Sequence, residues 1–445
     1  MPTPLSEMPF ERASQLVLHP VHRDVYPVLV QLITDLRQCR TDADYYEFQQ
    51  ELLTRVLEVQ AHRGECTRVA KRLRRSRAVP ADAPELRSGA DVNDPESWEL
   101  EGDVCERVDR QLRSIGDAMA WRLFSYNRRI IHALSRNDPS GPMAGKKGLL
   151  AERTFLAQRW HDDGDFALLH DLTSCLRIGD ATLFKVDGSD FEAFLHEIKT
   201  NAKRRRAGQL RRIKLAEDSV RDGGPLADDP ESQLVDLAIP YKTHLSSLRD
   251  AFAHARVRGV QSVKVSGGLA IVAADIQRGY ALWSEEDFLA RTDIDHRRAQ
   301  KRAGILNKGH HVTFRSDDLA ARSPVMPPWA IYPLPPLTCA GLIADAVMYI
   351  VTISSESLLT AFDDAGIRAV WALPPGLEQL QPGQVVLNAQ KNGRTIQMKQ
   401  AELRRVSLEL ADLPTWVKGV ESLFELTNLG EHPWPNFMDE WKVWI

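Results

Sequence analysis

The stretch RIGDATLFKVDGSDFEAFLHEIK, from Arg177 to Lys199, carries the pattern of a tight β-hairpin. Two runs rich in apolar and aromatic residues, 181–186 and 191–199, flank the turn residues Asp-Gly-Ser-Asp. Gly188 occupies the first central position of this turn, as a type II′ turn requires. The sequence therefore predicts two antiparallel strands joined by a two-residue loop.

A two-residue loop also fixes which residues of the two strands face each other. Asp180 should face Glu197, and Lys199 should lie on the same side of the sheet because side chains alternate along a strand. Carboxylates directly opposite each other are destabilising unless their charge is offset. A divalent cation between Asp180 and Glu197 would offset it, and Mg²⁺ prefers such carboxylates together with phosphate oxygens. A solvated strand edge is the alternative interpretation.

This arrangement resembles the signature of the PD-(D/E)XK nuclease superfamily, which has the restriction-endonuclease-like fold. That signature is an acidic residue at a strand start, a hairpin, and then Glu or Asp, any residue, and Lys. The resemblance implies that Asp180, Glu197 and the backbone carbonyl of Ile198 bind Mg²⁺ or Mn²⁺. It also implies that Lys199 positions the attacking water. The match covers roughly residues 146–280 and departs from the signature where Gly179 replaces a proline.

The resemblance points to two more catalytic residues. Glu152, on the helix predicted before the hairpin, is the expected third carboxylate and a further metal ligand, with Asp171 as the second choice. Gln209, on the helix predicted after Lys199, is the polar residue that many such folds carry there. These residues complete the expected catalytic set.

Eight Lys or Arg residues and no acidic residue lie from Lys199 to Lys214. Alone, such a run is equally typical of a solvated helix face. Beside a phosphodiester site, we expect it to follow the nucleic-acid backbone, which Lys and Arg contact without reading sequence. The predicted nucleic-acid-binding residues are Lys203, Arg204, Arg205, Arg206, Arg211, Arg212 and Lys214. A second basic run, Arg68–Arg77, is interpreted as solvated surface.

The composition is that of a globular protein: 445 residues, 43% hydrophobic and 27% charged. Because the formal net charge is −4, any nucleic-acid surface must be local. The five cysteines form no C-x-x-C pair, which argues against a disulfide framework and a cysteine-based zinc site and favours a reducing cytoplasm. No signal-peptide pattern begins the chain. The most apolar segment, Leu337–Ser354, contains Asp345 and predicts a buried strand or helix rather than a membrane span.

Periodicity and turn residues divide the chain into three regions. Residues 1–145 show helical periodicity, residues 146–285 alternate helix and strand patterns, and residues 286–445 contain short apolar runs separated by turns. The predicted fold class is α/β (α+β). It has a restriction-endonuclease-like mixed-sheet core, a helical N-terminal region and a C-terminal α+β region of unknown role.

The expected function is Mg²⁺-dependent phosphodiester hydrolysis by a DNA endonuclease acting on double-stranded DNA. Resemblance to standalone bacterial nucleases implies defence against phage or foreign DNA, alone or with a protein partner of a defence system. One alternative is a nuclease-fold subunit that binds nucleic acid or a partner and is inactive alone, and another is an RNA-cleaving nuclease. We also expect a homo-oligomer without membrane association.

Overall fold

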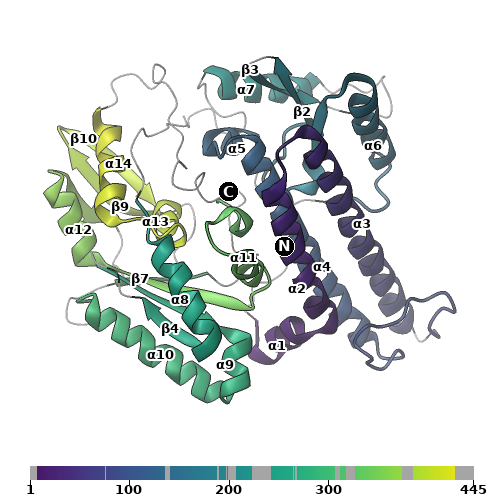
Figure 1. Cartoon of the computed structure of the whole chain (residues 1–445), viewed down its shortest axis with the longest axis horizontal. Helices are drawn as coiled ribbons and strands as arrows, with labels where there is room; N and C mark the ends of the chain where they lie inside the picture. The colour runs from purple at the N-terminus through teal and green to yellow at the C-terminus, as the bar shows by residue number, and fades with distance from the viewer. Residues whose placement is uncertain are drawn as a thin grey trace. The chain divides into compact units, whose positions relative to one another are not determined.

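The computed structural model in Figure 1 describes residues 8–75, 77–135, 141–187, 190–196, 198, 207–222, 242–263, 265, 268–305, 311–316, 326–372 and 384–425. The chain forms two compact units. The first comprises Met1–Val235 and Asp318–Tyr332, and the second comprises Asp236–Asp317 and Pro333–Ile445.

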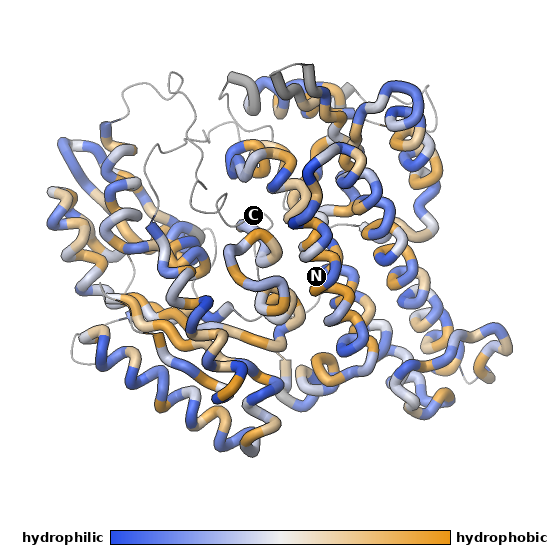
Figure 2. The backbone as a smooth tube through the Cα atoms, viewed as in Figure 1, coloured by the Kyte–Doolittle hydropathy of each residue, from blue (hydrophilic) through white to orange (hydrophobic). Residues whose placement is uncertain are grey.

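The first unit is mainly helical. Its helices are α1 (Phe10–Leu18), α2 (Pro20–Gln38), α3 (Asp42–Leu73), α4 (Pro95–Leu123), α5 (Arg128–Leu134), α6 (Leu149–Gln158) and α7 (Ala207–Asp222), with a π-helical turn at Arg159–Asp163 and 3₁₀ turns at His170–Leu172 and Trp329–Ile331. Figure 2 shows hydrophilic and hydrophobic residues alternating along α2, α3 and α4, as expected of helices that bury one face.

Capping residues set the starts of the two longest helices. Thr41 and Asp44 form a capping box at α3, in which each side chain accepts the backbone N–H of the other residue. Asp94 caps α4, and Pro95 takes the first helical position, where no N–H is needed. Residues 77–94, between α3 and α4, contain turns and neither helix nor strand.

A three-stranded antiparallel sheet completes the first unit. Its strands are β1 (Phe166–Leu169), β2 (Ala181–Asp187) and β3 (Asp190–His196), in the order β1-β2-β3. Gln49 of α3 pairs with the backbone of β1: its amide donates to the Ala167 carbonyl and its oxygen accepts the Leu169 N–H, both at 2.9 Å. These bonds satisfy backbone groups that β2 does not reach.

The second unit contains two antiparallel sheets, in the orders β4-β5-β7-β6 and β10-β9-β8. Its strands are β4 (Val260–Val263), β5 (Leu269–Asp275), β6 (His311–Arg315), β7 (Val347–Ser354), β8 (Arg368–Trp371), β9 (Val385–Lys391) and β10 (Arg394–Lys399). Its helices are α8 (Leu245–Arg258), α9 (Ile276–Leu282), α10 (Glu285–Arg302), α11 (Pro336–Ile343), α12 (Ser355–Asp364), α13 (Gln400–Leu408) and α14 (Leu413–Glu425).

Helices cover both faces of the larger sheet. On one face, Val272 of β5 belongs to an apolar cluster with Phe288 of α10. On the other, Phe252 of α8 lies against Tyr349 of β7, with ring centroids 6.4 Å apart, and Tyr349 pairs with Ala273. Because alternate residues point to opposite faces, β5 is apolar at nearly every position.

The α+β class is confirmed, and the apolar segment Leu337–Ser354 contains α11 and β7. Every strand pairing among the described residues is antiparallel, so no mixed sheet is seen there. β4 and β5 were expected in one core with the hairpin. In the structure β4 pairs with β5, and β5 pairs with β7, within the second unit. The restriction-endonuclease-like core and the boundaries at residues 145 and 285 remain predictions. No described helix is long and apolar enough to span a bilayer.

Candidate active site

The hairpin has the predicted register. Ala181 pairs with His196 and Asp187 pairs with Asp190, as a two-residue loop requires. The loop residues 188–189 lie outside the described part of the chain, so the turn type remains a prediction. The strand alignment follows from the loop length alone.

Several predicted site residues also lie outside the described part of the chain: Glu197, Lys199, Lys203, Arg204, Arg205 and Arg206. The predicted pairing of Asp180 with Glu197 therefore remains a prediction. Gln209 lies in α7, and its side chain is not among those described.

Asp180 is held in a defined position directly before β2. Its N–H donates to the His196 carbonyl at 2.8 Å, and its Oδ2 accepts the N–H of Ile198 at 2.7 Å. The preceding Gly179 has φ +81°, and a Cβ there would lie 3.1 Å from the His196 carbonyl oxygen. Proline, with φ fixed near −65°, cannot adopt this conformation. The backbone conformation at this position therefore suits glycine and excludes proline.

The bond between Ile198 and Asp180 matters because Ile198 separates Glu197 from Lys199 in the sequence. The Asp180 carboxylate thus contacts the middle residue of the Glu-Ile-Lys tripeptide. It does so through the N–H of Ile198, while the predicted role of the Ile198 carbonyl as a metal ligand remains untested.

His170 fastens the turn that leads to Asp180. One ring nitrogen, Nδ1, lies 3.2 Å from the Gly179 carbonyl, and Nε2 lies 2.7 Å from the Thr182 hydroxyl. Burial, together with the nearby Arg177, lowers the pKa of His170 to about 4. Since a carbonyl only accepts, neutral His170 donates from Nδ1 to Gly179 and accepts at Nε2 from Thr182.

Lys146 joins the two carboxylates that the sequence offered as alternatives. Its ammonium lies 2.7 Å from Glu152 of α6 and 2.5 Å from Asp171. Burial opposes the charge on Lys146, but the bonds to Asp171 and Glu152 outweigh it and raise its pKa. Glu152 is 2% exposed, and its Oε2 has no hydrogen-bond partner among the described residues.

Helix α6 lies against the end of β3 that carries the Asp180 contact. Its Phe155, one turn after Glu152, lies beside His196 with ring centroids 5.3 Å apart and ring planes tilted by 47°. His196 is the residue whose carbonyl accepts the Asp180 N–H. The helix of the predicted third carboxylate therefore packs beside this end of the hairpin.

The described basic residues of α7 face solvent. Arg211, Arg212 and Lys214 are exposed, whereas Ile213 and Ala216 of the same helix are buried. Such a helix presents its cations on the side opposite to its packing face. The exposure is compatible with contact to a nucleic-acid backbone.

The second basic run, Arg68–Arg77, is engaged in ion pairs with neighbouring acids. Arg68 pairs with Glu65 and Asp82, and Arg74 pairs with Glu99. These pairs agree with the interpretation of this run as solvated surface.

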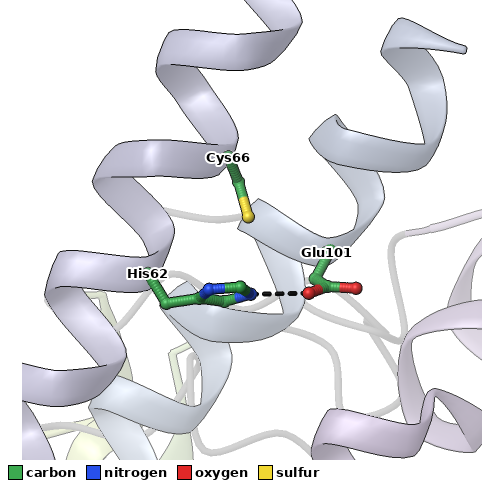
Figure 3. Close-up of side chains that lie close together, drawn as sticks. All are labelled: His62, Cys66 and Glu101. Atoms are coloured by element: carbon green, nitrogen blue, oxygen red, sulfur yellow. Dashed lines mark hydrogen bonds and ion pairs between the residues drawn. The ribbon is translucent and has the colours of Figure 1, made fainter. Parts of the chain in front are cut away.

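One polar cluster was not predicted from the sequence. His62 and Cys66 of α3 lie beside Glu101 of α4, as Figure 3 shows, and their potential ligand atoms are all within 4.8 Å of one another. A His and a Cys four residues apart on a predicted helix share one face, and this signal could have been read. The contribution of Glu101 could not, because it comes from another helix.

Comparisons with family models, with curated proteins and with solved structures found no match to this chain. The nuclease resemblance therefore rests on the sequence pattern. The described geometry around Asp180 does not test that pattern, because Glu197 and Lys199 lie outside the described part of the chain.

Proposed function

We propose that the chain is a Mg²⁺-dependent phosphodiesterase that acts as an endonuclease on double-stranded DNA. The observation that carries this proposal is the bond from the Ile198 N–H to Asp180 Oδ2, at 2.7 Å. It joins a carboxylate that precedes a strand to the middle of a tripeptide that contains a second carboxylate and a lysine. The hairpin register supports the same arrangement.

The described residues offer ligands that suit the ion. Mg²⁺ prefers carboxylate oxygens, and Mn²⁺ accepts the same set. Asp180 supplies one carboxylate, and the buried Oε2 of Glu152 lacks a hydrogen-bond partner among the described residues. Lys146 pairs with Oε1 of Glu152. Because an unpaired buried carboxylate oxygen is costly, a second cation at Oε2 would remove that cost.

Each residue of the site has a distinct part in the proposed hydrolysis. When bound, Mg²⁺ supplies charge stabilisation at the phosphoryl group. Asp180 and Glu197 hold the negative charge that attracts the ion, and Asp180 also fixes the strand end at Ile198. Lys199 orients the attacking water and stabilises charge that develops on the phosphate oxygens. His170, being neutral, holds the turn and transfers no proton.

The substrate assignment follows from charge. Exposed cations on α7 follow the candidate site in the sequence, and such cations bind the phosphates of a duplex. Defence against foreign DNA in the cytoplasm, as a homo-oligomer or with a protein partner, rests on the resemblance to standalone bacterial nucleases alone.

The test is incubation of the pure chain with plasmid, linear duplex DNA, single-stranded DNA and RNA, with Mg²⁺ and with EDTA. We expect cleavage of duplex DNA that requires Mg²⁺. Asp180→Asn keeps an acceptor for the Ile198 N–H but removes the charge. It should therefore lower turnover by about a hundredfold or more while the chain stays folded.

Asp162→Asn, at an exposed carboxylate of the π-helical turn, is the matched control and should cleave like the wild type. Wild-type turnover by Asp180→Asn would refute the site. Cleavage of RNA alone would favour the RNA-cleaving alternative. Mg²⁺-dependent binding without cleavage of any substrate would favour the subunit that is inactive alone.

A further inference from the structure

The cluster of His62, Cys66 and Glu101 lies far along α3 from the residues that hold β1. His62 and Cys66 are one helical turn apart, and Glu101 projects toward both from α4 (Figure 3). Cys66 and Glu101 are fully buried, and the side chain of His62 is 14% exposed. The three residue types combine a nitrogen, a sulfur and an oxygen donor in one small space.

Glu101 is a fully buried carboxylate whose two oxygens have different surroundings. Oε1 lies 2.6 Å from Nε2 of His62. Oε2 accepts the backbone N–H of Arg87 at 3.0 Å and that of Ser88 at 3.4 Å. The Arg87 N–H also lies 3.3 Å from Oε1, so the backbone contacts both oxygens, and Oε1 in addition contacts His62.

A second observation indicates that the cluster lacks a component. His19 is 4% exposed, and its Nε2 has no hydrogen-bond partner among the described residues, although it lies 3.7 Å from Oε2 of Glu101. Its Nδ1 accepts the Val21 N–H at 3.3 Å. In the neutral ring Nε2 must therefore carry the hydrogen. A buried N–H group without a hydrogen-bond acceptor costs free energy. An ion bound beside Glu101 that brought Oε2 closer to Nε2 of His19 would allow this hydrogen bond to form and remove the cost.

We propose that Nε2 of His62, Sγ of Cys66 and Oε1 of Glu101 bind one Zn²⁺ ion, with His19 orienting Glu101 through Oε2. Zinc is bound by this combination of imidazole, thiolate and carboxylate, whereas Mg²⁺ avoids sulfur. A water molecule takes the fourth position. On binding, the Cys66 S–H bond breaks, its proton leaves to solvent and a Zn–S bond forms. Before binding, Nε2 of His62 carries the hydrogen that it donates to the Glu101 carboxylate. On binding, this proton moves to Nδ1 and Nε2 binds the ion.

Such an ion would fasten α3 to α4. Both helices hold the candidate active site, α3 through Gln49 at β1 and α4 through Arg113, whose guanidinium donates to the Asp171 carbonyl. The zinc proposal does not depend on the proposed nuclease activity, because its ligands lie on other residues and its measurements need no substrate. It is also compatible with the absence of a multi-cysteine framework, since the cluster uses a single cysteine.

The first test uses the wild-type chain, stripped with a chelator and titrated with Zn²⁺ and Co²⁺. We expect one tightly bound ion per chain, about one proton released per Zn²⁺, and a higher thermal midpoint with zinc than with chelator. The Co²⁺ complex should show a thiolate-to-cobalt charge-transfer band. No tight binding, or a Co²⁺ complex without that band, would overturn the proposal whatever the variants do.

The second test compares variants by the same Co²⁺ spectrum and Zn²⁺ titration. Cys66→Ser should abolish the band, whereas Cys105→Ser, at a buried cysteine one turn beyond Glu101 on α4, should retain it. His19→Asn keeps a good N-cap for α2 and should weaken Zn²⁺ binding by about tenfold or more. A band that survives in folded Cys66→Ser would overturn the proposal.

Discussion

At the scale of single residues, Asp180 owes its position to two unusual neighbours. Gly179 has a backbone conformation with φ +81°, and the His170 ring donates a hydrogen bond to the Gly179 carbonyl. The backbone N–H of His170 also donates to the Asp180 carbonyl at 3.0 Å, while the Asp180 N–H donates to His196. Both backbone groups of Asp180 are thus satisfied, which leaves the side chain to determine what the residue binds.

The neutral state of His170 predicts a pH dependence of stability. Its pKa falls from 6.5 to about 4 on folding, so the unfolded chain binds the proton more readily between these values. The stability contributed by neutral His170 is fully present above pH 6.5 and is lost as the pH falls toward 4. Since each pKa unit corresponds to about 1.4 kcal/mol, the free energy of unfolding should fall by about 3 kcal/mol.

His170→Asn keeps a donor near Nδ1 and removes the titrating ring. It should be less stable than the wild type at pH 7, and the gap in the free energy of unfolding should narrow as the pH falls to 4. Urea titrations between pH 7 and pH 4 measure the free energy of unfolding of both proteins. His254→Asn, at an exposed histidine of α8, is the matched control. A gap that stays constant with pH would contradict the assigned charge state.

The residues themselves show what could be predicted at this scale. The register of the hairpin was predictable because a two-residue loop allows a single alignment. The pairing of Lys146 with both Glu152 and Asp171 was not, because the three residues belong to different segments and meet only through packing. The side-chain contact between Asp180 and Ile198 also needed the structure, since register fixes only which residues face each other.

At the scale of elements, one face of α4 holds the segment that follows β1. Arg113 donates to the Asp171 carbonyl, and Asp117 accepts the N–H groups of the loop at residues 174–175. Between them, Gly116 lets the helix approach so closely that an added Cβ would lie 2.1 Å from the Leu172 carbonyl oxygen. Helical periodicity predicted this helix but did not indicate that Gly116 is the point at which it contacts Leu172.

Two glycine substitutions on neighbouring helices should therefore have opposite effects. Gly116→Ala should destabilise the first unit by about 1–3 kcal/mol or more, because the methyl group has no space against Leu172. Gly64→Ala on α3 meets nothing within 4 Å and should stabilise it by up to about 1 kcal/mol through helix propensity. Urea unfolding of the two variants measures the difference. Equal effects would show that α4 does not contact this segment closely.

At the scale of the whole molecule, charge is distributed unevenly. The net charge is −4, yet α7 exposes Arg211, Arg212 and Lys214. A chain of this net charge gains little from nonspecific attraction to DNA, so binding must depend on local cations. The proposed nucleic-acid contact is thus open to a direct electrostatic test.

Replacing Arg211, Arg212 and Lys214 by Gln should weaken binding to all duplex sequences about equally. The slope of log K against log salt should shrink by a little under one per lost phosphate contact. Binding isotherms at several salt concentrations measure it. The matched control replaces Arg297 and Arg298, exposed on α10. An unchanged slope in the α7 variant would place the DNA contact elsewhere.

The division of the chain into units was the part least open to prediction. Periodicity describes neighbours in sequence, whereas the first unit also includes Asp318–Tyr332, which follow the 236–317 segment of the second unit. Arg37 of α2 donates to the carbonyls of Ala330 and Tyr332, at 3.1 and 2.8 Å. Nothing in the pattern around Arg37 indicates a partner so distant along the chain.

This discontinuity has a consequence for how the protein is made. A ribosome delivers α2 early, but Ala330 and Tyr332 emerge only after residues 236–317 have been synthesised. At roughly 5–20 residues per second, the wait between Arg37 and Tyr332 is on the order of tens of seconds. During that time the Arg37 guanidinium and the surface that later receives the buried Trp329 face solvent or a chaperone. The first unit therefore cannot be completed until residues 236–317 of the second unit have been translated.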